Sequence, residues 1–233
     1  PGRSFFLFGP RGTGKSTWTR SQFPDALRLD LLDLEAFRAH QSRPERLAEA
    51  VRARPRGQFV VIDEVQKVPE LLSTVHLLME EDRSRRFVLT GSSARKLRRG
   101  GVNLLGGRAL LCTAHPFMAA ELGSGFRLGD AVRRGLLPLV LAAPEAEQVL
   151  AGYAALYLKE EVQAEALTRN LEAFSRFLVT ASFSQAGVLS VSTVARDLGL
   201  PRKTVEGYFS LLDDLLLSVR LPVFTRRAKR AMT

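Results

Sequence analysis

The chain has 233 residues, among them 34 Lys and Arg against 24 Asp and Glu, so its formal net charge is +10 at pH 7. Hydrophobic residues make up 45% of the chain and charged residues 25%, and this composition excludes disorder over most of the length. The length predicts one large domain or two smaller ones. The excess of positive charge favours a polyanionic partner such as nucleic acid, although an Arg-rich surface can also serve solubility alone.

The chain contains a single cysteine, Cys112, and no apolar run of 18 residues. An internal disulfide is therefore excluded and no transmembrane helix is predicted, so we expect a cytoplasmic protein without a membrane partner. The chain opens on Pro1 and Gly2 without Met and closes in a basic stretch, and both features indicate a fragment of a longer protein.

The first predicted element is a short apolar strand over residues 4–8, which is followed at once by a glycine-rich loop. The loop fits the pattern G-x-x-x-x-G-K-[ST], whose glycines let backbone N–H groups point at a phosphate chain, and a helix is predicted after it. We expect Lys15 to neutralise the β- and γ-phosphates of a nucleotide and Ser16 to coordinate Mg²⁺. The predicted nucleotide-binding residues are Gly9, Pro10, Arg11, Gly12, Thr13, Gly14, Lys15, Ser16 and Thr17.

An acidic pair follows the next buried strand. A second strand or its exit loop is predicted over residues 28–34 and a helix over residues 44–54, and a strand over residues 58–62 then ends in Asp63 and Glu64. A P-loop enzyme needs a carboxylate at the end of a neighbouring strand to hold Mg²⁺, and Asp63 suits that role. Glu64 is then placed to polarise the attacking water as a general base. A solvated strand end is the simpler alternative.

Basic residues gather after an amphipathic helix predicted over residues 69–81 and around a strand predicted over residues 86–89. We expect this basic segment to lie beside the nucleotide site, where it either grips a phosphate backbone or carries an arginine finger into a neighbouring subunit, with a solvated face as the alternative. Arg108 is the favoured finger, because it follows two glycines and precedes a weaker strand at residues 110–112. The segment contains Arg83, Arg85, Arg86, Arg95, Lys96, Arg98, Arg99 and Arg108, and no Asp or Glu between them.

Strands that alternate with helices predict an α/β fold with a central parallel sheet of the P-loop type. From about Glu145 the apolar residues recur at helical spacing instead, so the second half is predicted to be helical. We therefore expect a P-loop domain over residues 1–148 and a helical, winged-helix-like domain over residues 149–233.

The helical half contains a candidate winged helix-turn-helix. A helix over residues 191–198, a tight turn over 199–201, a longer helix over 202–217 and a candidate wing strand over 219–224 have that order. The second helix would present its first side chains to DNA, whereas the acidic side chains of Glu206, Asp213 and Asp214 would face it poorly. A winged helix that only packs against protein is the alternative. The candidate nucleic-acid contacts are Arg202, Lys203, Thr204, Arg226, Arg227, Lys229 and Arg230.

Four segments together resemble a family of prokaryotic AAA+-like ATPases known as AAA_14, whose members carry a C-terminal region named DUF4143. They are GPRGTGKST, VVIDEVQKVPELL, VLTGSSARKL and LLGGRALLCTAHPFMAAEL. In AAA+-type ATPases the strand that ends at residues 90–93 lies between the two phosphate-site strands, and a polar residue at its end orients the hydrolytic water or senses the γ-phosphate. The resemblance thus makes Thr90, Ser92 and Ser93 candidates, with Ser92 assigned to the catalytic set, although a serine here could instead cap a helix.

These observations predict an ATP hydrolase that depends on Mg²⁺ and couples hydrolysis to the binding or remodelling of DNA, as a homo-oligomer and possible ring. The preference for ATP over GTP comes from the resemblance. The predicted catalytic residues are Glu64, Lys15, Ser92 and Arg108, and the predicted metal ligands are Ser16 and Asp63. The competing interpretation is a nucleotide-gated regulator or protein-remodelling switch with low turnover and no direct action on DNA.

Overall fold

A computed structural model describes residues 2–93, 97, 105–157 and 170–222 of the chain. Five strands form one sheet in the order β2-β3-β4-β1-β5, and every neighbouring pair is parallel. The predicted α/β fold with a parallel P-loop sheet is confirmed. The strands are β1 (Ser4–Phe8), β2 (Leu27–Asp30), β3 (Phe59–Asp63), β4 (Arg86–Gly91) and β5 (Ala109–Thr113).

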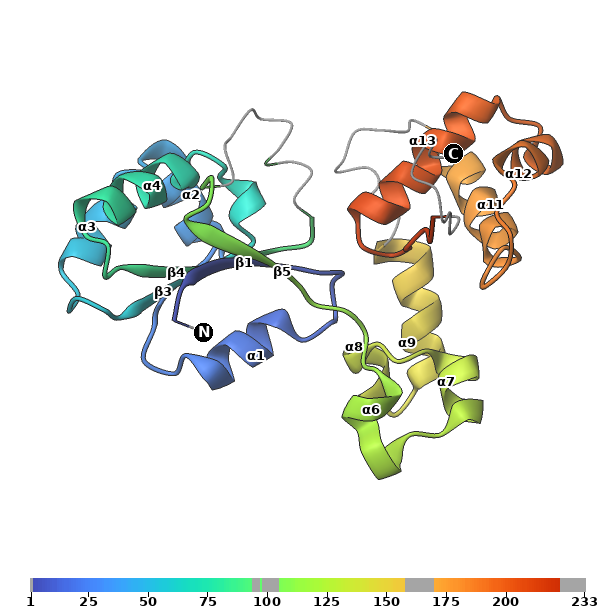
Figure 1. Ribbon diagram of the computed structural model, residues 1–233, viewed down its shortest axis with the longest axis horizontal. Coiled ribbons are helices and arrows are strands. Elements are labelled where there is room, and N and C mark those ends of the chain that lie inside the picture. The colour runs from blue at the N-terminus through green and yellow to red at the C-terminus, as the bar shows by residue number, and fades with distance from the viewer. Residues whose placement is uncertain (1, 94–96, 98–104, 158–169, 223–233) are drawn as a thin grey trace, which may run out of the picture. The chain divides into compact units, whose positions relative to one another are not determined.

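The middle of the sheet forms the core because its strands are apolar on both faces. All five residues of β1 are buried, and in β3 and β4 only the first residue is partly exposed. Such continuous apolar runs are typical of parallel strands covered on both sides. Helix α1 (Lys15–Gln22) lies on one face of the sheet, and α2 (Leu34–Ser42), α3 (Arg46–Arg52) and α4 (Leu71–Glu81) lie on the other (Figure 1).

Parallel topology brings the carboxyl ends of the strands to one edge of the sheet, and this edge carries the polar segments singled out in the sequence. The glycine-rich loop follows β1, the acidic pair lies at the end of β3, and the Thr-Gly-Ser-Ser segment lies at the end of β4. A 3-10 turn, η1 (Val65–Lys67), leads from the acidic pair toward α4.

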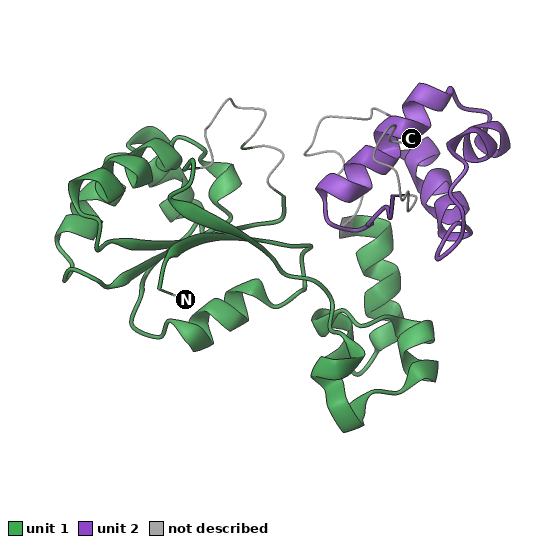
Figure 2. Ribbon diagram, viewed as in Figure 1, with its two compact units in different colours: residues 1–166 green, residues 167–233 purple. Residues whose placement is uncertain are grey.

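A group of short helices follows β5 and belongs to the same compact unit as the sheet. They are α6 (Ala119–Leu122), η2 (Gly123–Gly125), α7 (Leu128–Arg134), α8 (Pro138–Leu141), α9 (Ala146–Gly152) and the π-helical turn η3 (Tyr153–Tyr157). Leu137, Val140 and Ala146 form a small core with Val149 and Tyr153 packed against it. The structure divides into compact units of residues 1–166 and 167–233 (Figure 2), later than the predicted boundary at 148/149, because α9 packs on α8 in the first unit.

The second unit is helical, as predicted. Its described elements are α11 (Leu171–Ser182), α12 (Val191–Leu198) and α13 (Arg202–Asp214). Helices α11 and α13 pack through the aromatic rings of Phe174, Phe177, Tyr208 and Phe209, and α12 buries aliphatic side chains. Gly199 adopts a left-handed φ of 63° in the turn between α12 and α13, a conformation that favours glycine. The helices predicted over residues 191–198 and 202–217 are present as α12 and α13, the second of which ends at Asp214, and α12, the turn and α13 are called the helix-turn-helix below.

The wing strand is not formed in the described part of its predicted range. Residues 219–222 have no strand conformation, and the described residues of the second unit contain no other strand with which they could pair. Arg220 instead reaches back to Asp213 at 2.5 Å. Residues 223 and 224 lie outside the described residues. In the part of the chain that the structure describes, no helix combines the length and the apolar character needed to span a membrane.

Candidate functional site

The glycine-rich loop joins the carboxyl end of β1 to the amino end of α1 and folds around its own lysine. Gly12 and Gly14 both have φ of 82°, which lets the chain turn back on itself. The buried Lys15 ammonium donates to the carbonyl oxygens of Gly9 at 2.6 Å and Pro10 at 3.1 Å, and Thr13 Oγ1 donates to Pro10 at 2.8 Å. Gly14 occupies the N-cap of α1, and no described side chain caps this helix end. The arrangement suits an anion, which the helix dipole also favours.

The segment after β5 braces this loop from outside the sheet. A Cβ atom at Gly9 would overlap the carbonyl oxygen of Ala114, and one at Gly12 would lie 2.9 Å from Leu139 Cβ. The Leu139 amide donates to the Gly12 carbonyl at 3.1 Å, and the Tyr153 hydroxyl donates to the Arg11 carbonyl at 3.1 Å. Sequence reasoning missed both bracing residues, because no local pattern links them to the loop.

The two predicted metal ligands meet across the carboxyl edge of the sheet. Ser16 Oγ donates to Asp63 Oδ2 at 2.5 Å, and Thr90 Oγ1 donates to Asp63 Oδ1 from the neighbouring strand. Asp63 is 9% exposed and Thr90 is fully buried, so the carboxylate is held by partners on both sides. A hydroxyl and one carboxylate are the oxygen donors with which proteins hold Mg²⁺ beside nucleotide phosphates, so the residues present fit that ion.

Glu64 lies directly beyond this pair in an uncommon backbone conformation. Its φ of 58° and ψ of 45° are left-handed, and its amide donates to Thr90 Oγ1 at 3.4 Å. Its carboxylate accepts a hydrogen bond from Gln66 Nε2. The side-chain amide of Gln66 also donates to Ser92 Oγ at 3.3 Å. The structure therefore gathers Lys15, Ser16, Asp63, Glu64 and Ser92 at one edge. Gln66 also lies at this edge, and Thr90 contacts Asp63. The spacing of residues in the sequence indicated neither of these two contacts.

Two family models cover almost the whole chain. The model described as an AAA domain, AAA_14, matches residues 2–123. The chain belongs to this AAA domain family. Residues 126–233 match a domain of unknown function, DUF8612, so the expected DUF4143 identity of the C-terminal region is wrong. Helix α8 and the helix-turn-helix both lie in this second match.

Solved structures and curated proteins add little beyond the family. The Thermotoga maritima RuvB Holliday junction branch migration motor is similar with 15% sequence identity and a TM-score of 0.39, over 90% of this chain and 79% of that chain. A likeness at this level carries no argument about activity. No curated protein matches the chain.

The arginines of the basic segment lie elsewhere in the AAA domain than expected. Arg85 and Arg86 stand at the start of β4 and Arg108 directly before β5, which is the amino edge of the sheet and thus opposite the phosphate loop. The expectation that this segment lies beside the nucleotide site is wrong for its described members, since a strand that ends at the site must begin at the far edge. Arg95, Lys96, Arg98 and Arg99 lie outside the described residues.

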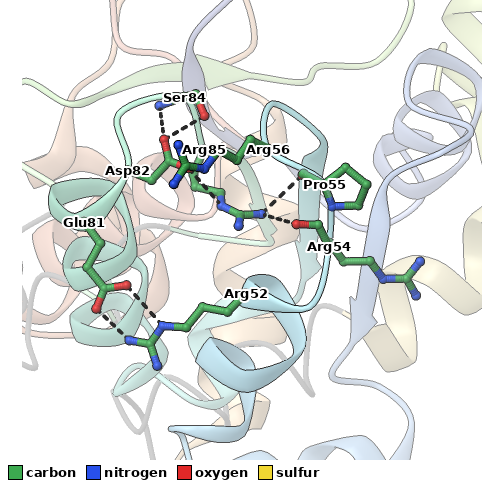
Figure 3. A network of polar contacts seen from close by, with 8 residues as sticks. All are labelled: Arg52, Arg54, Pro55, Arg56, Glu81, Asp82, Ser84 and Arg85. Carbon is green, nitrogen blue, oxygen red and sulfur yellow. Dashed lines mark hydrogen bonds and ion pairs between the residues drawn. The ribbon is translucent and has the colours of Figure 1, made fainter.

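Arginines of the basic segment, together with Arg52 and Arg56 from outside it, neutralise the acidic carboxyl end of α4, where the helix dipole disfavours negative charge. Arg108 Nε donates to Glu80 at 2.6 Å and holds the pKa of that carboxyl below its ordinary value. Arg52 does the same for Glu81, also at 2.6 Å (Figure 3). The hydrogen bonds from Ser84 lower the pKa of Asp82, with smaller effects from Arg56 and Arg85.

The candidate nucleic-acid residues of the second unit are only partly within the described structure. Arg202 and Lys203 are exposed at the start of α13 and Thr204 is half-buried. Arg202 Nε donates to Glu206 Oε1 at 2.8 Å, one helical turn along, so part of its charge is already neutralised. Arg226, Arg227, Lys229 and Arg230 lie outside the described residues.

Proposed function

We propose that this chain hydrolyses ATP in a reaction that depends on Mg²⁺. The observation that carries the proposal is the contact between Ser16 and Asp63, which joins the phosphate loop to the carboxylate of the neighbouring strand. When bound, Mg²⁺ would supply positive charge that offsets the negative charge of the phosphates. Ser16 and Asp63 would hold it. The family match supports a nucleotide-hydrolysing domain of AAA type.

The remaining roles follow from position. Lys15 would leave its two loop carbonyls and neutralise the phosphates, because an ammonium ion gains more from phosphate oxygens than from neutral carbonyls. The loop N–H groups would hold the phosphate chain. Glu64 would take a proton from the attacking water, and Ser92 at the end of β4 would orient that water or contact the γ-phosphate.

Two substitutions test the activity. Glu64→Gln removes the proton acceptor but keeps the shape, so it should bind ATP normally while kcat falls about 100-fold or more. Lys15→Ala should abolish binding in a calorimetric titration with ATP and Mg²⁺. Glu70→Gln, which changes an exposed carboxylate at the start of α4, is the matched control and should keep full turnover.

Undiminished turnover in Glu64→Gln would remove Glu64 from the mechanism. Tight ATP binding with negligible turnover in the unmodified chain would favour the alternative function, a nucleotide-gated regulator.

We further propose DNA as the macromolecular partner, bound through the helix-turn-helix. The support is the exposed pair Arg202 and Lys203 at the start of α13, the end that would enter a major groove. The carboxylate of Glu206, one turn along the same helix, pairs with Arg202 and would itself repel phosphates, so Lys203 is the stronger candidate for a phosphate contact. We also propose a homo-oligomer in which Arg108 acts on a neighbouring subunit, and a cytoplasmic location, where the exposed thiol of Cys112 would stay reduced.

A further inference from the structure

Gln66 is a buried polar residue with no role in the reaction described so far. It lies in η1, is 8% exposed, and directs its amide at the carboxyl edge of the sheet. Its Nε2 donates to a carboxylate oxygen of Glu64 and to Ser92 Oγ at 3.3 Å. Its Oε1 is buried without a hydrogen-bond partner among the described residues. A buried amide oxygen without a hydrogen bond lowers the stability of the fold. Stability alone therefore does not explain a glutamine at this position.

The opposite strand is shaped to admit this side chain. A Cβ atom at Gly91 would overlap Gln66 Oε1 and would lie 3.3 Å from the ring of Phe8. Gly91 is an ordinary strand residue without a left-handed φ, so backbone conformation does not require glycine there. The close approach of Gln66 does require it. The Asp-Glu-Val-Gln and Thr-Gly-Ser-Ser segments therefore meet in one contact.

That contact acts directly on the Glu64 side chain. The Glu64 backbone is held in its left-handed conformation by Thr90, but the side chain still has rotatable bonds that can turn the carboxylate away from the phosphate loop. Gln66 restrains the carboxylate itself and ties it to Ser92, the residue at the end of the adjacent strand. A proton acceptor must be held within hydrogen-bond reach of the attacking water to be effective.

We infer that Gln66 is a positioning residue, which orients the Glu64 carboxylate toward the attacking water and couples it to Ser92. The inference rests on the proposed ATP hydrolysis and deepens it. Gly91 is required for this contact, because only a residue without a side chain leaves room for the Gln66 amide.

The first test replaces Gln66 by Met, which has a similar length and volume but no hydrogen-bond donor. Gln66→Met should lower kcat for ATP about tenfold and leave the Kd of ATP within about twofold, because the amide contacts the catalytic carboxylate and not the phosphate loop. Gly91→Ala keeps the glutamine but displaces it, and should lower kcat to a similar extent. Thermal unfolding of each variant shows whether it is folded at the assay temperature.

A double-substitution cycle separates positioning from general support of the fold. If Gln66 acts through Glu64, the Glu64→Gln and Glu64→Gln/Gln66→Met proteins should have the same residual rate. A further tenfold loss in the double variant would overturn the inference, as would unchanged kcat in both Gln66→Met and Gly91→Ala. A rise in kcat in Gln66→Met would also overturn it, because the contact would then restrain Glu64 in an inactive position.

The same set of proteins distinguishes a failure of the inference from a failure of the proposed function. If the unmodified chain hydrolyses ATP and Glu64→Gln abolishes that activity, the function stands, and the Gln66 and Gly91 variants decide the inference alone. If turnover is absent or insensitive to Glu64→Gln, both are overturned. If Gln66→Met does not fold, Gly91→Ala decides the outcome, because it leaves the glutamine side chain intact and displaces it by a single methyl group.

Discussion

Asp63 joins the two halves of the candidate site. Its two carboxylate oxygens accept from Ser16 on one side and Thr90 on the other, so one side chain connects the phosphate loop, β3 and β4. Ser16 and Asp63 are also the residues that would hold Mg²⁺, so the same carboxylate serves both the proposed metal site and the connection between the strands.

Residue-level prediction from the sequence succeeded where the functional residues are neighbours in the chain. Lys15 and Ser16 follow from one contiguous pattern, and Asp63 and Glu64 from their place after an apolar strand. Thr90 and Gln66 acquire their contacts only through the pairing of β3 with β4, in which Ile62 lies beside Leu89. No spacing within the sequence reports which residues face each other across two strands that are separated by a helix.

The proposed role of Arg108 also depends on a single side chain, which would act on the active site of another subunit. Its own phosphate loop lies at the opposite edge of the sheet, so it can serve hydrolysis only in trans. If it does so, a mixture of Arg108→Ala and Glu64→Gln proteins should hydrolyse ATP faster than the sum of the separate variants, since mixed interfaces contain one intact site. Turnover of the mixed and separate proteins by phosphate release measures this.

Arg83→Ala is the control for that experiment, because Arg83 is exposed in the same segment and should have full activity when tested alone. A fully active enzyme that light scattering shows to be monomeric would contradict the role in trans.

At the scale of elements, the acidic end of α4 is attached to the amino edge of the sheet by arginines from other elements. Arg85 is the central contact, since it donates to the carbonyl oxygens of Arg54 at 3.1 Å and Pro55 at 3.3 Å and pairs with Asp82 (Figure 3). Its side chain is 8% exposed, whereas Arg56, which also pairs with Asp82, is 84% exposed. Arg85 and Arg56 should therefore contribute differently to the stability of the fold, although nothing in the sequence distinguishes them.

Arg85→Ala should lower the free energy of unfolding by about 2 kcal/mol or more, because it removes a buried guanidinium that donates to two backbone carbonyls of a tight loop. Arg56→Ala is the matched control and should cost less than about 0.5 kcal/mol, as is usual for exposed ion pairs. Urea unfolding followed by circular dichroism measures both. Equal small effects would show that the Arg85 contacts do not stabilise the fold.

Most of the secondary structure could be predicted from the sequence. The helix predicted over residues 69–81 is present as α4, and the alternation of strands and helices correctly indicated a parallel sheet. The candidate wing strand is absent over its described residues 219–222, which include Pro222 without an N–H donor, and the described part of the second unit offers no strand for pairing.

At the scale of the whole molecule, the net charge of +10 is less specific than it first appeared. Arg52, Arg85 and Arg108 form ion pairs on the AAA domain, and Arg202 pairs within α13. The net charge already subtracts the carboxylates, so these ion pairs do not lower it, but they engage these four arginines internally and leave the excess charge to other cations. The support for DNA thus moves from the composition to the helix-turn-helix and its exposed cations.

Binding of a fluorescent duplex DNA, followed by anisotropy across a KCl series, tests this partner. Log K should fall linearly with log[salt], and Lys203→Ala should reduce the magnitude of that slope by about 1, as expected for the loss of one phosphate contact. Arg38→Ala in α2 removes a charge that is also exposed, but on the AAA domain, and should leave the slope unchanged. A slope near zero for the unmodified chain would contradict binding dominated by phosphate contacts.

The sequence by itself determined the class of fold, the phosphate loop and the position of Asp63 and Glu64 after a buried strand. Each of these depends on contiguous residues and on a local periodicity. Only the tertiary structure decided that the described arginines of the basic segment lie at the amino edge of the sheet, that Leu139 and Tyr153 brace the phosphate loop, and that Gln66 enters the space left by Gly91. These contacts join residues far apart in the chain. They exist because the strand order β2-β3-β4-β1-β5 and close packing bring such residues together.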